Sequence, residues 1–431
     1  MPVQIVLRVL EGSLKGQEFV FDRRTTCLIG RSFECQIQLS SQEELNTISR
    51  YHCLLDINPP EIRIQDFGSL NGTYVNGKKI GQRPDRLRGG GKLTNLPEYE
   101  LRDGDKIGIG DTIVGVNVEV SSLGDSQDLS GDSLGYRVLP PQDETRLLFG
   151  GYGNLKLIEQ NEFNKVYLAF DRANGDWVIL KTLQPKTLKR RAIAAFLEAM
   201  EQIKTLDHAN IVRLRNYGYH DGRFFFIWNY GEEGNVTQLL DKRGGRLSID
   251  EALPIVFDIL TGLEYAHNSE VPQGTQGDDM VTGLVHGDIK PGNILLGRSD
   301  RTLTAKLGDY GLLRAFDRAG LSQKTFNKRD ATMLGFLPRQ QLIDFNYDRP
   351  DADIWAVAAT LYAMLTGKYP RRFGKKDPLL VVLRSDAIPI RRREPMLPEP
   401  LAKAIDFALQ DQPTIYFKTA GEFRQALEAA I

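Results

Sequence analysis

The stretch LVHGDIKPGNILL at residues 284–296, followed by LGDYG at residues 307–311, decides the fold of the larger part of this 431-residue chain. It carries two aspartates, a lysine and an asparagine on what we expect to be two adjoining hairpin loops. Phosphoryl transfer needs one carboxylate to orient the attacking hydroxyl, and a second carboxylate with an amide oxygen to hold Mg²⁺ on the phosphates. The residue types of this stretch fit that chemistry.

These motifs resemble the catalytic loop and the metal-binding motif of protein kinases, and the order of the remaining landmarks extends the resemblance over residues 147–431. By that resemblance Asp288 is the catalytic base and Lys290 neutralises the transferring phosphoryl group, while Asn293 and Asp309 bind Mg²⁺ or Mn²⁺. The run KPGN is the form common in Ser/Thr rather than Tyr kinases. The resemblance therefore implies transfer of the γ-phosphoryl group of ATP to Ser or Thr of a protein substrate.

The same resemblance assigns the residues around the nucleotide. Lys181 in WVILK would pair with the α- and β-phosphates, and Asp353 in DADIW would be the buried helix aspartate that fixes the catalytic-loop backbone. The other implied nucleotide-binding residues are Val166, Ile179, Trp228, Tyr230 and Leu295. Because Ile179 stands where alanine is usual above the adenine, and Trp228 stands just before the hinge, we expect a smaller adenine pocket.

Two loops of the kinase pattern carry different chemistry here. The loop that covers the phosphates normally offers three glycines, whereas IEQNEFNKVY has Glu159, Asn161 and Asn164 at those places, and a carboxylate there repels phosphate unless it turns outward. In the catalytic loop, Gly287 replaces the arginine that clamps a phosphorylated activation loop. This replacement disfavours switching through a phosphate on that loop.

Two pairs of partners are also changed. Ala199 stands where the family has the glutamate that pairs with the strand lysine, with Glu198 one position earlier. One residue on a helix is about 100°, so Glu198 reaches Lys181 only if the helix rotates or shifts. At the end of the activation segment the usual Pro-Glu pair is a proline followed by Arg339, and the arginine that would bind that glutamate is Tyr416. We expect Arg339 to stack on Tyr416 instead.

Residues 1–120 carry short alternating apolar segments (VQIVLRV, EFVFD, IRIQDF, IVGVNVEV) broken by Gly, Asn and Asp, which is typical of an all-β sandwich. Three motifs fall in the expected loops: GRS at 30–32, SRYH at 49–52 and DFGSLNGTYVNG at 66–77. Guanidinium forks, a serine hydroxyl and an asparagine amide are together suited to hold a phosphate on a peptide.

In this order and spacing the motifs resemble the forkhead-associated (FHA) domain, which binds phosphothreonine peptides. The resemblance implies that Arg31, Ser49 and Arg50 face the phosphate and that Asn71 grips the peptide backbone. Many family members have a hydroxyl residue before the asparagine, where this chain has Leu70, so one phosphate contact is expected to be missing. The alternative is that Arg31 and Arg50 are solvated loop charges on a sandwich used only for packing.

The two resemblances predict a multidomain chain, with an all-β FHA sandwich followed by an α+β two-lobed protein-kinase fold. Residues 121–146 are rich in Ser, Gly, Asp and Pro, which predicts a flexible acidic linker. We expect lobe boundaries at about 147–230 and 231–431. In the linker, Thr145 with Leu148 three residues later could be a phosphorylation site that the FHA module binds, or an unmodified linker residue.

The composition excludes some partners. Lys and Arg total 55 against 56 Asp and Glu, a net charge of −1, which gives no global attraction for nucleic acid or anionic membranes. The N-terminus has no basic-then-apolar signal and the longest apolar run, 355–365, is too short to span a bilayer, so we expect a cytoplasmic protein. Cys27, Cys35 and Cys53 lack metal-ligand spacing and are expected to be reduced strand residues.

Two hypotheses for function remain at this point. The first is an FHA-linked Ser/Thr kinase recruited by phosphothreonine partners, favoured because the residues expected to touch metal, phosphoryl group and nucleophile are all retained. The second is a pseudokinase scaffold, a phosphopeptide-dependent adaptor with little or no ATP turnover, which the crowded adenine pocket supports. A rise of the melting temperature with MgATP would separate them.

Overall fold

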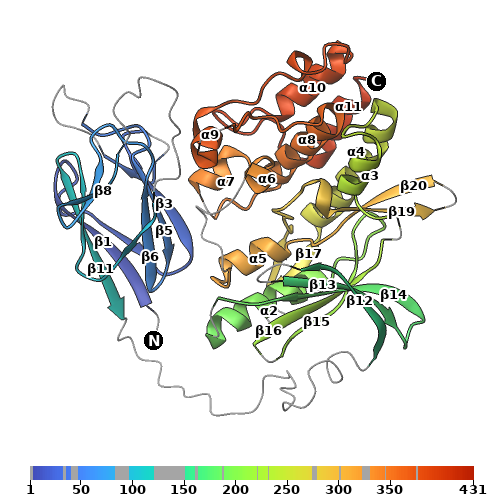
Figure 1. Cartoon of the computed structure of the whole chain (residues 1–431), viewed down its shortest axis with the longest axis horizontal. Helices are drawn as coiled ribbons and strands as arrows, with labels where there is room; N and C mark the ends of the chain where they lie inside the picture. The colour runs from blue at the N-terminus through green and yellow to red at the C-terminus, as the bar shows by residue number, and fades with distance from the viewer. Residues whose placement is uncertain are drawn as a thin grey trace. The chain divides into compact units, whose positions relative to one another are not determined.

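The computed structural model describes residues 3–32, 35–39, 47–82, 97–120, 151–160, 164–186, 189–220, 222–231, 233–273, 279–299, 302–322, 331–344, 346–374 and 377–431. Figure 1 shows the chain coloured from its N-terminus to its C-terminus. The expected linker at 121–146, with Thr145, lies outside the described residues, as does Asn161.

Every regular element described between residues 3 and 120 is a strand, as the alternating apolar pattern predicts. The strands are β1 (Val3–Glu11), β2 (Glu18–Phe21), β3 (Thr25–Gly30), β4 (Ile37–Gln38), β5 (Cys53–Asn58), β6 (Glu61–Asp66), β7 (Thr73–Val75), β8 (Lys78–Gly81), β9 (Tyr99–Leu101), β10 (Lys106–Ile109) and β11 (Thr112–Val120). They form a six-stranded sheet in the order β2-β1-β11-β10-β7-β8 and a five-stranded sheet in the order β4-β3-β5-β6-β9.

Side chains from both sheets share one apolar core. In β1, Ile5, Leu7 and Val9 recur at every second position and are buried, and they belong to the same cluster as Ile29 and Leu55 of the other sheet. A period of two turns one face of a strand toward the core and the other toward solvent. The two sheets therefore form a sandwich, and the loops between strands carry the motifs quoted above.

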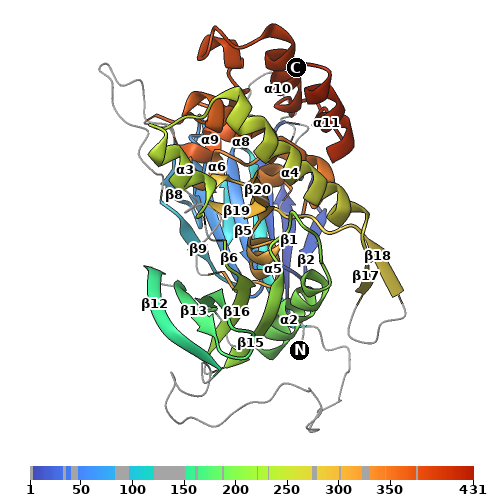
Figure 2. The same ribbon diagram turned by 90° about the vertical axis from the view of Figure 1, so that its right-hand side faces the viewer.

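The chain from residue 151 onward begins with a five-stranded antiparallel sheet in the order β12-β13-β14-β16-β15. Its strands are β12 (Tyr152–Gln160), β13 (Asn164–Asp171), β14 (Asp176–Leu183), β15 (Leu214–His220) and β16 (Arg223–Asn229), and the helix α2 (Arg190–Lys204) follows β14 in the chain. Figure 2 shows α2 beside β15. Three phenylalanines, Phe196 of α2 with Phe224 and Phe226 of β16, pack edge to face between helix and sheet.

The remainder is mainly helical. The helices are α3 (Val236–Lys242), α4 (Ile249–Asn268), α5 (Leu312–Arg318), α6 (Ala331–Leu334), α7 (Arg339–Ile343), α8 (Pro350–Thr366), α9 (Pro378–Arg384), α10 (Glu399–Ala408) and α11 (Ala420–Glu428), with short 3-10 turns η1 (Pro291–Asn293) and η3 (Ile390–Arg392). Two hairpins interrupt them: β17 (Glu270–Gln273) with β18 (Asp279–Thr282), and β19 (Ile294–Ser299) with β20 (Thr302–Leu307).

The helix α8 forms the centre of this helical part. It packs against α4, α10 and α11 (Figure 1), and its residues from Asp351 to Leu365 are buried. The long apolar run of the sequence is thus a core helix, because protein surrounds it on all sides. Among the described residues, none of the helices combines the length and the apolar character needed to cross a membrane.

Candidate active site and phosphate-binding loops

Four candidate residues of the catalytic and metal-binding motifs meet at the base of the β19–β20 hairpin. The backbone pairing of Ile294 with Leu307, and the hydrogen bond from Gly308 N to Asn293 O at 2.8 Å, bring the two motifs side by side. Lys290 Nζ lies 2.7 Å from Asp288 Oδ2, and Asn293 Nδ2 donates to the same oxygen at 2.8 Å. The sequence motifs therefore converge in space as expected.

Asp309 turns the chain just after β20. Its φ is +54°, an unusual value for a residue other than glycine, and such local strain is often found at functional sites. Its Oδ2 accepts a hydrogen bond from Lys181 Nζ at 2.6 Å. Burial alone would raise the pKa of Asp309, but the charge and hydrogen bond of Lys181, together with the charge of Lys290, hold this pKa below its ordinary value.

Lys181 finds its anion in Asp309 and not on α2. Burial disfavours the ammonium ion, yet the Asp309 carboxylate, together with those of Asp288 and Glu159, raises the pKa of Lys181, so the side chain is charged. Among the described residues no ion pair joins Lys181 to Glu198, and Ala199 beside it has no charge to offer. The expected loss of the helix glutamate as a partner therefore holds for this structure.

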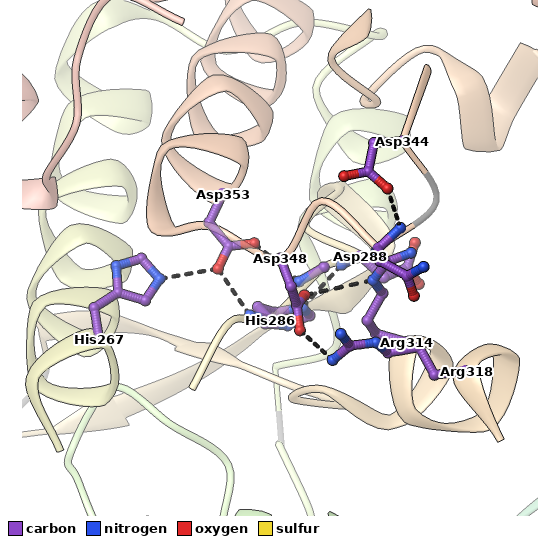
Figure 3. Close-up of polar contacts among 10 residues, drawn as sticks. His267, His286, Asp288, Arg314, Arg318, Asp344, Asp348 and Asp353 are labelled. Carbon is purple, nitrogen blue, oxygen red and sulfur yellow. Dashed lines mark hydrogen bonds and ion pairs between the residues drawn. The ribbon is translucent and has the colours of Figure 1, made fainter. Parts of the chain in front are cut away.

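A buried carboxylate from α8 fixes the backbone of the catalytic loop. Asp353 accepts hydrogen bonds from the backbone N of His286 at 2.7 Å and of Gly287 at 2.9 Å, and from His267 Nε2 at 2.9 Å (Figure 3). His286 in turn accepts from Asp288 N through Nδ1 at 3.2 Å and donates through Nε2 to a backbone carbonyl. Asp353 has the structural role expected from the sequence.

Four of the residues expected around the nucleotide share one face of the five-stranded sheet. Val166 pairs with Lys181, and Ile179 pairs with Trp228, and cross-strand partners and alternate residues of a strand point to the same side. The Trp228 side chain is only 3% exposed. A large buried ring next to Ile179 supports the expectation of a small pocket.

The segment after β16 completes this region. Tyr230 is partly exposed, and Gly231 packs so closely on Leu295 that an added Cβ would lie 3.2 Å from the Leu295 Cβ. Leu295 therefore lies directly against the segment that follows β16. Of the positions of the covering loop, Glu159 is exposed at the end of β12 and Asn164 begins β13.

The candidate phosphate-binding residues of the sandwich lie on neighbouring loops. Arg31 N donates to Ser49 O at 3.1 Å, and Ser49 Oγ accepts from Leu70 N at 3.0 Å. Asn71 Nδ2 donates to Thr47 O at 2.7 Å, and both Arg31 and Asn71 are exposed. These bonds draw three separate stretches of sequence to one end of the sandwich.

Asp66 organises the last of these loops, and no role for it was expected from the sequence. Its buried carboxylate accepts from the backbone N of Gly68 at 2.7 Å and of Ser69 at 2.9 Å, and from the hydroxyl groups of Ser69 and Thr73. Such short-range bonds set the path of the backbone through Asn71. An aspartate followed by Gly, Ser and Thr within seven residues is the signal that could have identified it.

The contact expected between Arg339 and Tyr416 is absent among the described residues. Arg339 does not stack on Tyr416: its buried guanidinium donates to the carbonyls of Val382 and Ser385 at the end of α9, while Tyr416 stacks on Phe407 with ring centroids 5.1 Å apart. A buried guanidinium needs several acceptors, which an aromatic ring cannot supply.

The three cysteines differ in their settings. All are buried and outside disulfides, as expected, but the expected strand position is wrong for Cys35, which lies in the loop before β4, whereas the other two lie in strands. Its Sγ is 3.3 Å from Arg50 O, so a polar contact with a neighbouring loop, and not a strand ladder, holds it.

Comparison with known proteins agrees with both halves of the fold. A model of the protein kinase domain family matches residues 152–404, and a model of the FHA domain matches residues 27–110. The crystal structure of Rad53 1-466 in complex with AMP-PNP has a TM-score of 0.50 and 19% sequence identity, covering 98% of this chain and 100% of that one. This last likeness is one of fold alone.

Several curated relatives are named as Ser/Thr protein kinases. PknJ of Mycobacterium tuberculosis is 27% identical over 292 residues, which is 66% of this chain and 46% of PknJ. The kinase cds1 of Schizosaccharomyces pombe is 26% identical over 259 residues, which is 57% of this chain and 50% of cds1. The chain thus spans about half the length of these relatives. Because the kinase model covers more than half of its residues, the chain belongs to the protein kinase domain family, with an FHA domain ahead of the kinase domain.

Proposed function

We propose that the chain is a Ser/Thr protein kinase that uses ATP with Mg²⁺ or Mn²⁺ and is recruited to its substrates by phosphothreonine-containing partners. The observation that carries the proposal is the joined cluster of Asp288, Lys290 and Asn293 beside the Lys181–Asp309 ion pair. One hydrogen-bonded group holds the base with a lysine and an amide, the other holds a lysine with a carboxylate, and the backbone bond from Gly308 N to Asn293 O joins the two. Phosphoryl transfer needs this combination.

The donor set fits a divalent cation. Asn293 donates through Nδ2 to Asp288, so its amide oxygen can serve a cation, and Asp309 uses Oδ2 for Lys181, so its Oδ1 can do the same. Oxygen ligands suit Mg²⁺, which also takes phosphate oxygens and water. MgATP, when bound, supplies the γ-phosphoryl group and the cation that neutralises its charge.

Each of the chain's own residues would have a different role in the transfer. Asp288 would accept the proton of the attacking Ser or Thr hydroxyl. Lys290, which bonds both oxygens of Asp288 at 2.7 and 2.9 Å, would neutralise charge on the transferring group. Lys181 would hold the α- and β-phosphates. Its lack of a helix glutamate partner leaves it less firmly positioned, which supports a slow enzyme.

The alternative, a pseudokinase scaffold, is favoured by the nucleotide side of the site. The buried Trp228 and its neighbour Ile179 narrow the space for adenine, and Glu159 adds a negative charge where phosphates would lie. The residues of the covering loop depart from the glycine-rich pattern at each of its three positions. A scaffold would keep the fold and bind partners without turning over ATP.

For the FHA domain we propose phosphothreonine-peptide binding through Arg31, Ser49, Arg50 and Asn71. The two arginines are exposed, and neither has a carboxylate partner among the described residues. Two exposed guanidinium groups near a serine hydroxyl give charge-assisted donors suited to phosphate. Leu70, which directly precedes Asn71, is exposed and offers no hydroxyl donor to a phosphate.

The test is phosphoryl transfer from labelled ATP to a generic basic protein by the purified full-length chain. We expect weak transfer that requires Mg²⁺ or Mn²⁺, falls by roughly a hundredfold or more in Asp288→Asn and Asp309→Asn, and falls less in Lys181→Met. The control is Asp207→Asn, which removes a carboxylate from an exposed ion pair far along the sequence from the motifs. If Asp288→Asn transfers phosphate as well as the wild type, the signal is contamination and the scaffold alternative stands.

A further inference from the structure

The space beside Gly287, directly before Asp288 in the catalytic loop, is filled by another side chain. Gly287 has φ +73°, and its N donates to Asp353. A Cβ added to it would lie 3.1 Å from the Cβ of Arg314 and 3.2 Å from its Cγ. The aliphatic stem of Arg314 therefore covers the catalytic-loop backbone at the residue next to the proposed base.

Arg314 belongs to α5, a helix held from a second side as well. α5 begins directly after Gly311, the last residue of the motif that contains Asp309. Phe316 of the same helix packs edge to face on Phe196 of α2, with ring centroids 5.2 Å apart. The backbone after the helix accepts a hydrogen bond at Leu321 O from Lys186 N at 2.7 Å. α5 thus joins the metal-binding turn, α2 and the catalytic loop.

Among the described residues, one carboxylate pairs with both arginines of α5, Arg314 and Arg318. Arg314 and Arg318 are one helical turn apart, so their guanidinium groups lie on the same side and repel each other unless an anion lies between them. Asp348 is this anion: its Oδ1 is 3.4 Å from Arg314 Nε and its Oδ2 is 2.5 Å from Arg318 Nη1 (Figure 3). The Arg314 side chain is 8% exposed and that of Asp348 25%, so salt screens the Arg314–Asp348 pair less than a surface pair.

Two guanidinium groups converging on one anion form an arrangement that suits a phosphate. In this chain the position is taken by a carboxylate that is always present. Asp348 lies two residues before α8, the helix that carries Asp353. The region around the start of α8 therefore contacts the catalytic loop in two ways. Asp353 bonds the loop directly, and Asp348 acts through Arg314.

On the basis of the proposed kinase function, we propose that Asp348 is a positioning residue for phosphoryl transfer. Through Arg314 it holds the catalytic loop at Gly287, and it supplies within the chain the anion that a phosphorylated side chain would otherwise supply. Phosphoryl transfer by this kinase domain then requires no prior phosphorylation. The contact of Arg314 with the catalytic loop depends on the glycine at 287, because a larger residue there would displace the Arg314 stem.

The kinetic test uses the full-length protein, treated with a phosphatase and checked by intact mass. The wild type should keep its rate within about twofold after this treatment. Asp348→Asn should lower kcat roughly tenfold while KM for ATP changes by less than about threefold, since the loss concerns positioning and not nucleotide binding. Asp348→Glu should recover most of the rate. Asp207→Asn, the matched loss of one carboxylate from the exposed pair with Arg213, should match the wild type.

A second measurement does not depend on activity. Hydrogen–deuterium exchange of a peptide spanning residues 284–296 should be faster in Asp348→Asn than in the wild type, and unchanged in Asp207→Asn. An unchanged kcat together with unchanged exchange in Asp348→Asn would overturn the positioning role, and loss of activity on dephosphorylation would overturn independence from phosphate. If the wild type transfers no phosphate, the proposed function fails, while the exchange result still decides whether Asp348 holds the loop.

Discussion

Single buried carboxylates organise both of the loops that we propose to be functional. Asp66 gathers the backbone and hydroxyl donors of the loop that ends at Asn71, and Asp353 gathers the backbone donors of the loop that ends at Asn293. A carboxylate accepts several bonds at once and is costly to bury without them. Each aspartate therefore fixes the path of its loop through donors of the loop itself.

The tautomer of His286 leads to a prediction on pH. Burial lowers the pKa of His286 from its ordinary 6.5, in agreement with its Nδ1 accepting a hydrogen bond from Asp288 N. His286 therefore binds a proton more readily in the unfolded chain than in the folded one. The contribution of neutral His286 to the free energy of unfolding is complete above about pH 6.5. It is lost as the pH falls from 6.5 toward the lower pKa of the folded state.

We therefore expect the free energy of unfolding of the kinase domain to decrease below pH 6.5, with a smaller slope in His286→Gln. Tryptophan fluorescence measures this in the full-length chain, because all three tryptophans, Trp177, Trp228 and Trp355, lie in the kinase domain. His208, whose pKa burial also lowers, keeps part of the slope in the variant. Equal slopes in the two proteins would contradict the assignment of a neutral His286.

The residues that the sequence identified and those that it missed differ in kind. Asp288, Asn293 and Asp309 lie within short motifs, so their spacing alone indicated that they would meet. Asp348 and Arg314 are 34 residues apart and meet only because α5 folds back beside the catalytic loop. No local sequence pattern predicts a contact between residues so far apart. Gly287 indicated that the usual arginine is absent, but it did not indicate which side chain fills the space.

At the scale of the elements, strand pairing decides the nucleotide side of the site. The register of β14 with β16 places Ile179 opposite Trp228. Among the described residues nothing accepts a hydrogen bond from the Trp228 indole Nε1, although the ring is buried. A buried donor without an acceptor is unfavourable, so the ring contributes less stability than its size suggests.

We predict that Trp228→Leu strengthens MgATP binding by about tenfold, which corresponds to about 1.4 kcal/mol, because it enlarges the space beside Ile179. The variant will be less stable without nucleotide, since removal of a buried ring leaves a cavity. The measurement is therefore the shift in melting temperature that MgATP produces in each protein relative to its own unliganded state.

The matched control is Trp177→Leu, the same substitution in β14 at a ring that is 41% exposed and packs on Phe170. It should leave the MgATP-induced shift unchanged. If Trp228→Leu also leaves the shift unchanged, then the indole does not obstruct the nucleotide, and the argument for a crowded pocket fails.

Structural features followed from the sequence where the apolar period was clear, as in the strands of the sandwich. They did not where polar residues set the structure. Arg339 was expected to stack on an aromatic ring, yet the carbonyl oxygens at the end of α9 and the Asp386 carboxylate bind it. The free carbonyls at a helix end attract cations, but the sequence does not say which helix end a distant arginine reaches.

At the scale of the whole molecule, the two domains should bind their ligands through separate residues. We predict that Arg31→Ala weakens binding of a phosphothreonine peptide by roughly ten- to a hundredfold, because a charge-assisted contact contributes about 1.5 to 3 kcal/mol. Isothermal titration with the phosphorylated and unphosphorylated forms of one peptide measures this. Transfer of phosphate to a generic basic protein should be the same in Arg31→Ala as in the wild type.

A control for this experiment is Arg63→Ala, which removes a partly exposed arginine of the same sandwich from a pair with Glu61 on the strand β6. Its peptide affinity should equal that of the wild type. If the isotherms of Arg31→Ala and the wild type coincide, Arg31 is a solvated loop charge and the sandwich does not bind phosphate there.

The buried cysteines can report on the opening of the FHA domain. The chain has three cysteines, all of them in this domain, and burial raises the pKa of the Cys27 and Cys53 thiols well above the ordinary value. A thiol reacts as its thiolate, so an alkylating reagent modifies these residues only when the sandwich opens. The rate of alkylation in the intact chain therefore measures the opening of the FHA domain alone. A bound peptide that slows alkylation does so by holding that domain closed.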